Sequence, residues 1–234
     1  REPSIKREDI ILSVGRLITT KHHDRLIEIF SRLKAPGWKL VIVGDDALKQ
    51  NNMAKLKSLV QNFRLNGLVV LAGSQENVFD YYQKSKIFAL TSSSEGFPNV
   101  IGEALAAGLP VVAYDCIAGP SEMINEGTNG YLVPVFDDEL YIIKLQSLID
   151  NEPLRLTMSA SAMESMGKFS VKTIGKQYLD FILPEQELDT FAHPFRHQPA
   201  SGYHSPEIRL HGTFSYNTVV GRMLKIFIHL GAFQ

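Results

Sequence analysis

Residues 87–103 read IFALTSSSEGFPNVIGE, a short apolar strand followed by a polar turn and the start of a helix. The turn contains Glu95, and the helix that Pro98 and Asn99 open contains Glu103, eight positions later. A turn that follows a strand and leads into a helix N-terminus is where an open α/β sheet binds anionic ligands. Two acids beside such a site predict a ligand with both phosphate and hydroxyl groups, such as a nucleotide sugar.

Apolar runs and helical patterns alternate on both sides of this stretch. The runs are continuous, which is typical of strands in a parallel sheet that is covered by helices on both faces. We expect strands at residues 10–14, 40–43, 68–71, 87–90, 110–113 and 131–133. We expect helices around residues 26–33, 56–63, 78–82 and 98–107, after Gly119-Pro120, and over 138–149, 153–166 and 171–182. The pattern predicts an α/β fold with a single Rossmann-like, doubly wound parallel sheet of about six strands.

The last part of the chain does not continue this pattern. Residues 183–234 contain five of the seven histidines, and their only sustained apolar stretch is Val219 to Phe233. We therefore assign residues 1–182 to one nucleotide-sugar-binding domain and residues 183–234 to an irregular C-terminal tail of unknown structure. The chain begins with Arg1 and has no signal-peptide pattern, so we expect a domain cut from a larger protein.

Composition excludes several classes of protein. The chain has 234 residues, a net charge of −1 and a pI near 6.7, so no basic field indicates a nucleic-acid partner. Cys116 is the only cysteine, which rules out an internal disulfide. No apolar run reaches the roughly 18 residues of a membrane-spanning helix.

Two cations follow the first strand. Gly15-Arg16 ends that strand and Lys21 comes five residues later, near a helix start. An arginine and a lysine at the carboxyl end of a strand could neutralise a diphosphate, because arginine suits bidentate oxyanion contacts and lysine supplies a point charge. Two solvated loop cations are the alternative.

The helix start also has two interpretations. The stretch Gly96–Asn99 offers backbone N–H groups to an anion, and Gly96 permits a close approach. A carboxylate one turn into the helix, at Glu103, can accept two hydrogen bonds from a vicinal diol such as ribose. The alternative is an ordinary capped helix whose acids are stabilised by the helix dipole alone.

Other polar groups favour structural roles. We expect Asp45-Asp46 to form a turn or a helix cap, because no third metal ligand is evident. For His22-His23, a capping or surface role is favoured over catalysis. A reactive Cys116 would need a base that the sequence does not identify, and the spacing of Tyr81, Tyr82 and Phe88 is that of core residues.

The ordered combination of these segments resembles the C-terminal half of a GT-B-fold retaining glycosyltransferase of the glycosyltransferases group 1, or GT4-like, family. The resemblance covers about residues 10–182. Its motifs are Val14-Gly15-Arg16 with Lys21, Val41-Ile42-Val43-Gly44, the run from Ser94 to Ala113, Gly119-Pro120-Ser121-Glu122 and Asn129 to Pro134. The sequence departs from the family at His22, where a small residue is frequent, and at Asp45-Asp46, where many members have a second glycine.

In that family this half of the protein binds the nucleotide-sugar donor. The resemblance implies that Glu103 bonds the ribose hydroxyls, that Glu95 contacts the donor sugar, and that Arg16 and Lys21 stabilise the departing diphosphate. It implies further donor contacts at Gly15, Gly96, Phe97, Pro98, Asn99 and Val100, with the base near the Gly73-Ser74 loop. A UDP- or GDP-linked donor and no metal are expected, because the two cations neutralise the diphosphate.

The implied function is transfer of a hexose to a glycan or lipid-linked acceptor in bacterial polysaccharide synthesis. The acceptor site would lie on an N-terminal domain that we expect to be missing here, so this chain alone would bind the donor weakly without transferring sugar. We expect a cytoplasmic protein whose membrane contact, in the full-length form, is at the inner face. A non-catalytic nucleotide-binding or scaffolding module with a partner chain is the alternative. An NAD-dependent dehydrogenase is disfavoured, because residues 15–20 lack the glycines of the G-x-G-x-x-G motif.

Overall fold

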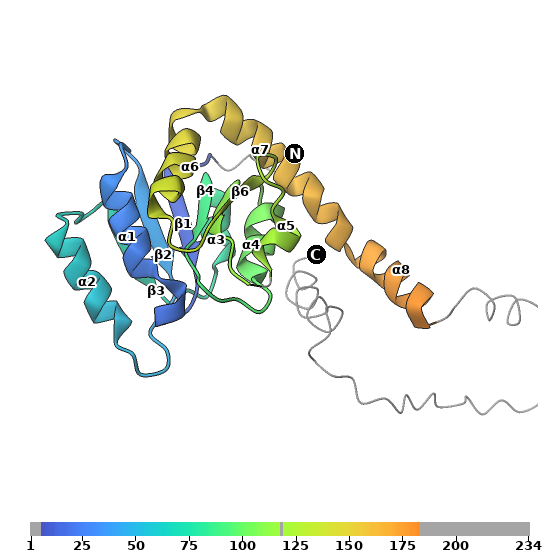
Figure 1. Ribbon diagram of the computed structural model, residues 1–234, viewed down its shortest axis with the longest axis horizontal. Coiled ribbons are helices and arrows are strands. Elements are labelled where there is room, and N and C mark those ends of the chain that lie inside the picture. Colours follow the sequence, from blue (N-terminus) through green and yellow to red (C-terminus); the bar gives the residue numbers. More distant parts are fainter. Residues whose placement is uncertain (1–5, 118, 183–234) are drawn as a thin grey trace, which may run out of the picture. The chain divides into compact units, whose positions relative to one another are not determined.

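The computed structural model describes residues 6–117 and 119–182 (Figure 1). The chain divides into two compact units, residues 1–166 and residues 167–234. The predicted tail, 183–234, and its histidines lie outside the described residues, so the domain boundary at residue 182 stays a prediction.

The first unit is built on one parallel sheet of six strands in the order β3-β2-β1-β4-β5-β6. The strands are β1 (Ile10–Val14), β2 (Lys39–Val43), β3 (Val69–Gly73), β4 (Ile87–Leu90), β5 (Val111–Tyr114) and β6 (Gly130–Val133). From β1 the chain moves outward to β2 and β3, then returns to β4 and moves outward in the other direction. This order confirms the predicted Rossmann-like, doubly wound sheet.

Helices connect the strands. They are α1 (His23–Arg32), α2 (Asn52–Asn62), α3 (Phe79–Lys84), α4 (Asn99–Ala106), α5 (Pro120–Met123), α6 (Asp138–Asp150), α7 (Glu152–Ser165) and α8 (Val171–Ile182), with short 3₁₀ turns at Thr19–Lys21 and Met166–Phe169. Right-handed crossovers that run in opposite directions from the centre of a sheet place their helices on opposite faces. Accordingly α1 packs on α2 and α6, whereas α4 packs on α5 and α7. Among residues 6–117 and 119–182, no helix combines the length and the apolar character that a membrane span requires.

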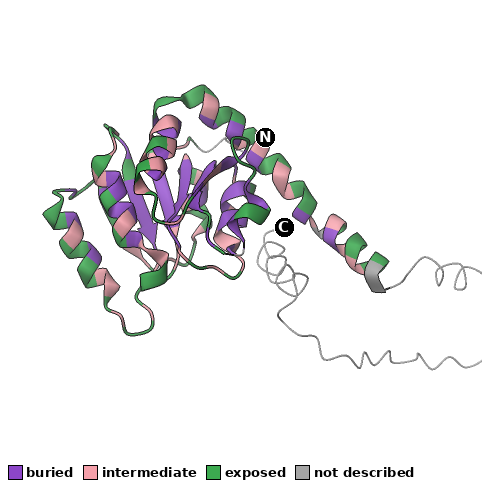
Figure 2. Cartoon of the chain, viewed as in Figure 1, coloured by how far each residue is buried: buried purple, intermediate pink, exposed green. Residues whose placement is uncertain are grey.

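Burial follows the position of each strand in the sheet. Every residue of β4 and β5 is buried, because helices cover both faces of the central strands (Figure 2). Strand β3 lies at the edge, and Val70 there is 40% exposed. The second predicted helix, around residues 56–63, begins and ends earlier in the structure, at Asn52 and Asn62. Leu56 and Val60 are buried, but Phe63 follows the end of α2 and is 42% exposed.

Two glycines permit close approaches that shape the carboxyl edge of the sheet. Gly44 has a φ of 147°, and a Cβ at this position would lie 1.9 Å from the carbonyl oxygen of Gly15. Gly119 has a φ of 123°, and a Cβ there would lie 2.2 Å from Cδ of Pro98. Only glycine fits at such contacts. The loops after β1 and β2 therefore touch through their backbones, and the start of α5 lies directly against the start of α4.

Candidate functional site

Lys21 and Glu95 form an ion pair at the centre of the sheet's carboxyl edge. Lys21 follows β1 and Glu95 follows β4, two strands that are adjacent in the sheet although the chain leaves the first in one direction and the second in the other. The carboxyl ends at such a reversal are where doubly wound sheets bind ligands. The Lys21 Nζ and Glu95 Oε1 atoms are 2.5 Å apart, and the two side chains are 15% and 9% exposed. A close charge pair with so little exposure is screened far less than a surface pair.

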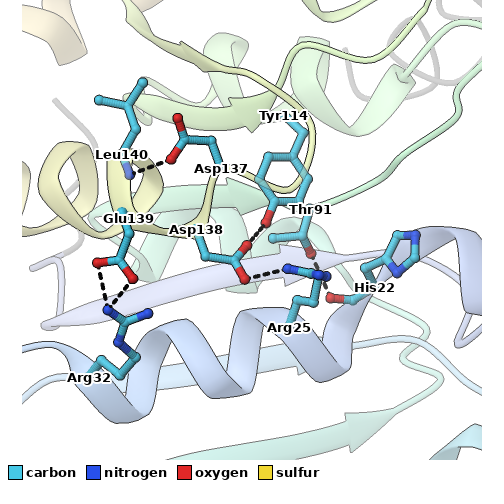
Figure 3. Close-up of polar contacts among 9 residues, drawn as sticks. All are labelled: His22, Arg25, Arg32, Thr91, Tyr114, Asp137, Asp138, Glu139 and Leu140. Atoms are coloured by element: carbon cyan, nitrogen blue, oxygen red, sulfur yellow. Dashed lines mark hydrogen bonds and ion pairs between the residues drawn. The ribbon is translucent and has the colours of Figure 1, made fainter.

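Hydrogen bonds hold the two loops in register. The Thr91 hydroxyl donates to the carbonyl oxygens of Lys21 and His22, each at 3.0 Å, and the backbone N–H of Ser93 donates to the Thr20 carbonyl. Figure 3 shows Thr91 directed at the His22 backbone. The His22 Nε2 atom lies 2.8 Å from Ser93 Oγ. These four hydrogen bonds, in addition to the ion pair, therefore fix the position of Lys21 relative to Glu95.

Glu103 is held by a buried tyrosine. The Tyr82 hydroxyl, on α3, donates a hydrogen bond of 2.8 Å to Glu103 Oε2. Burial, and next the charge of Glu103, raise the pKa of Tyr82 well above its usual value, so the phenol keeps its proton and remains a donor. Each carboxylate oxygen has more than one lone-pair position. Glu103 is therefore oriented by the protein and can still accept hydrogen bonds from a ligand.

Fewer backbone N–H groups are available at the predicted helix start than the sequence indicated. Pro98 has no N–H, and the Asn99 N–H donates to the carbonyl of Phe97 at 2.9 Å. Phe97 and Val100 are thus the members of that run whose N–H groups could face an anion. Gly96, before them, is exposed.

The remaining predicted residues lie at the same edge. The stem of Lys21 passes over Gly15, where a Cβ would be 3.7 Å from Lys21 Cε. Arg16 is exposed, and the described residues include no carboxylate in an ion pair with it. Ser74 is exposed directly after β3.

Cys116 lies in the loop after β5, close to Glu95. It is 3% exposed, and burial raises the pKa of its thiol, with the negative charge of Glu95 acting in the same direction. A thiol held in its protonated form is a poor nucleophile. This environment agrees with a structural role for Cys116.

The structure also decides the roles of the neighbouring polar residues. Asp46 Oδ1 accepts from the Met53 N–H at the start of α2, and Asp45 Oδ1 accepts from the Asp46 N–H, so the expected turn and cap roles are confirmed. A capping or surface role was expected for His22 and His23. His22 is the N-cap residue of α1, without a side-chain cap bond, whereas a surface role is wrong for His23, which is only 4% exposed. In the part of the chain that the structure describes, no three histidine, cysteine, aspartate or glutamate side chains gather closely enough to hold a metal ion.

Several members of the site could not be assigned from the sequence. Tyr82 has the spacing of a core residue, and its hydroxyl meets Glu103 only because α3 and α4 are neighbours. Thr91 and Ser93 belong to a serine-rich turn in which no single hydroxyl stands out. The one available signal for the central ion pair was that opposite charges follow β1 and β4, which a doubly wound order places side by side.

Comparison with known proteins identifies the family. Residues 1–165 match the model of the family described as glycosyl transferases group 1. The amylovoran biosynthesis glycosyltransferase AmsD of Erwinia amylovora is 32% identical over 177 residues, which are 76% of this chain and 49% of that protein. An N-acetylgalactosaminyltransferase of Campylobacter jejuni that acts on a diphospho-undecaprenol-linked sugar is 33% identical over 177 residues, which are 76% of this chain and 47% of that protein.

A solved structure agrees with both relatives. A mutant of TarM from S. aureus, in complex with UDP, Fondaparinux and alpha-GlcNAc-glycerol, superposes with a TM-score of 0.70 and 27% sequence identity. The match covers 78% of this chain and 37% of that one. The chain therefore spans about half the length of the curated relatives it matches, and less of the solved neighbour.

Proposed function

The chain belongs to the family of glycosyl transferases group 1, and we propose that it is the donor-binding half of a retaining hexosyltransferase. In this proposal the whole enzyme moves a sugar from a nucleoside diphosphate to a glycan or lipid-linked acceptor. The observation that carries it is the Lys21–Glu95 pair, 2.5 Å apart at the carboxyl ends of β1 and β4. A cation fixed there meets a diphosphate, and a carboxylate beside it meets sugar hydroxyls.

Lys21 and Arg16 act on the leaving group. As the bond between the sugar and the diphosphate breaks, negative charge grows on the diphosphate oxygen. Cations that are already in place stabilise this charge without reorganising, and such electrostatic stabilisation is the largest single contribution to catalysis in many enzymes. The two side chains take the place of a metal ion in this proposal. The UDP in the TarM complex supports UDP as the nucleotide.

Glu103 and Glu95 divide the recognition of the donor. Glu103, with one oxygen held by Tyr82, accepts hydrogen bonds from the ribose diol. Glu95, paired with Lys21, accepts from hydroxyls of the donor sugar near the reacting carbon. In this proposal the two carboxylates do not act together as a general acid and a general base. The acceptor and the groups that activate it therefore belong to a second domain. The greater length of the curated relatives supports this division.

Titration of the chain with UDP, GDP and ADP by isothermal calorimetry tests the proposal. We expect selective binding of one nucleotide and no sugar transfer by the chain alone. Glu103→Gln should weaken that binding by about tenfold, the effect of losing a hydrogen bond to a charged group.

Glu164→Gln is the matched control, because Glu164 is an exposed acid on α7. Its affinity should equal that of the wild type. Equal affinities for the wild type and both variants would place the nucleotide elsewhere and overturn the role of Glu103. A complete absence of nucleotide binding would favour a scaffolding module instead.

A further inference from the structure

Two bulky residues near the ion pair have a strained backbone. His22 has a φ of 48° and Phe136, in the loop after β6, has a φ of 71°. For side chains with a Cβ this left-handed region is uncommon, although histidine adopts it more often than most residues, and for a bulky phenylalanine it is unusual. Such strain persists only where the surroundings hold it, and it concentrates at functional sites. Both residues lie at the carboxyl edge of the sheet.

The two strained residues contact each other. Their rings meet edge to face, with centroids 5.0 Å apart and planes at 88°. The Arg25 guanidinium lies 4.6 Å from the centroid of the Phe136 ring, and the ring of Tyr114 lies 6.1 Å away. Phe136 is nevertheless 47% exposed, so burial of apolar surface alone does not explain its place.

Hydrogen bonds to Asp138 hold two side chains that contact the Phe136 ring, Arg25 and Tyr114. Arg25 and the Tyr114 hydroxyl both donate to Asp138, at the start of α6, as Figure 3 shows. Burial, and then the bond to Asp138, raise the pKa of Tyr114, which keeps its proton. Arg25 therefore contacts Phe136 and α6 at the same time, and the loop after β6 is tied to the start of α1.

His22 connects this cluster of side chains to Lys21. The two residues are adjacent in the chain, and Thr91 bonds the carbonyl oxygens of both. His22 ends the 3₁₀ turn that contains Lys21 and directly precedes α1, so its left-handed conformation fixes how that turn joins the helix. The lysine side chain has a flexible stem of four carbons, so its ammonium keeps one position only if the backbone that carries the side chain is fixed. The observed result is the 2.5 Å contact with Glu95.

We propose that His22 and Phe136 are positioning residues, whose ring contact holds the turn after Lys21 and keeps the Lys21 ammonium beside Glu95, ready for the donor diphosphate. The part that concerns the diphosphate rests on the proposed function, whereas the part that concerns Lys21 and Glu95 does not. Neither ring touches the reacting atoms in this proposal. Their effect is the preorganisation of a cation.

The test compares Phe136→Gly, His22→Gly and the double variant in their affinity for UDP, by calorimetry, and for uridine, by NMR titration. Each single variant should bind UDP two- to tenfold more weakly, the range that corresponds to one aromatic contact. Uridine affinity should not change, because uridine has no phosphate. The double variant should lose no more than His22→Gly alone, because the ring contact that Phe136→Gly removes is already absent in that variant.

Two further variants separate positioning from general stability. Phe136→Tyr keeps the ring and should bind UDP as the wild type does. Arg64→Gly relieves the same kind of strain, at a φ of 56° beyond the end of α2, and should leave UDP affinity unchanged. Crystal structures of the glycine variants at positions 22 and 136 should show Lys21 displaced from Glu95.

Additive losses in the double variant, or an equal loss of uridine and UDP affinity, would overturn the positioning role. So would crystal structures in which Lys21 keeps its contact with Glu95 in both variants. If the wild-type chain binds GDP or ADP in place of UDP, the same titrations use that nucleotide and its nucleoside. If it binds none of the three nucleotides, the proposed function fails. The positioning of Lys21 is then judged by those crystal structures alone.

Discussion

The amino and carboxyl edges of the sheet use their charges in different ways. At the amino edge, Arg7 donates to the carbonyls of Ser85 and Ala107, and Arg155 donates to those of Leu148 and Ile149 at 2.5 and 2.8 Å. Both guanidiniums line one cavity of about 310 Å³. At the carboxyl edge, Lys21 binds a carboxylate from another loop.

The direction of the helices explains this difference. In a doubly wound sheet the helices run opposite to the strands, so their C-termini meet the amino edge and their N-termini meet the carboxyl edge. Unpaired carbonyls at helix C-termini attract cations, and N–H groups at N-termini attract anions. The arginines at the amino edge therefore stabilise the fold by binding helix carbonyls, whereas the carboxyl edge remains suited to an anionic ligand. The predictions below test this division.

The largest effect is expected at the amino edge. Arg155→Met should lower the free energy of unfolding by about 2–4 kcal/mol, because it leaves buried carbonyls without a donor. Arg155 is 8% exposed and also stacks on Trp38 at 5.2 Å. Urea denaturation measures the loss, and the folded variant should bind UDP normally. Lys57→Met, at an exposed position of α2, is the control. A stable Arg155→Met protein would show that the amino edge does not depend on this arginine.

The second effect is a pH dependence at the carboxyl edge. Burial, and then the charge of Lys21, lower the pKa of His23 to about 4, from 6.5. Below pH 6.5 the unfolded chain takes up a proton that the folded protein refuses until about pH 4. The stabilisation from neutral His23 is therefore complete above pH 6.5 and is lost as the pH falls, by about 3 kcal/mol in total.

His23→Gln should remove this part of the acid sensitivity. Unfolding free energies of both proteins at pH 7 and pH 4.5 measure it, and the wild type should lose about 2–3 kcal/mol more than the variant. If the unfolding free energies of both proteins changed equally between pH 7 and pH 4.5, His23 would take up its proton as readily in the folded protein as in the unfolded chain. That outcome would weaken the contrast between an uncharged, buried histidine here and the bonded arginines of the other edge.

The smallest effect separates ligand binding from folding. Tyr82→Phe removes the donor to Glu103 but keeps the ring, whose centroid is 5.8 Å from that of Phe88. The free energy of unfolding should fall by only about 1 kcal/mol. UDP affinity should fall severalfold, because Glu103 loses its orientation. Tyr81→Phe on the same helix is the control. A fall in stability without a change in UDP affinity would mean that Tyr82 serves the fold alone.

Local patterns predicted much of the architecture. The runs at 10–14 and 87–90 are strands with those bounds, and the helix predicted at 171–182 has those bounds as well. Phe63 was expected at the end of the helix around 56–63, but that helix ends one residue before it and the Phe63 side chain is exposed. Periodicity identifies a face but not the residue at which a helix stops.

The site was predicted as single residues and observed as pairs. Glu103 and Glu95 were expected to face a donor, but nothing in the local pattern assigned Tyr82 to the first or Lys21 to the second. Both pairings join residues from different elements. The positive φ angles of His22 and Phe136 could not be predicted either, since few residues other than glycine adopt that conformation and no local pattern marks where they do.

The features that the sequence determined and those that the tertiary structure decided have different physical causes. The sequence by itself determined the fold class and the edge of the sheet at which the charged loops gather, because hydrophobic patterning is local and parallel strands bring all their following loops to one edge. Only the tertiary structure decided which charge meets which. Lys21 and Glu95 are 74 positions apart, and their interaction depends on a separation of 2.5 Å and on low exposure. No local pattern encodes a distance between two loops, so that choice belongs to the assembled sheet.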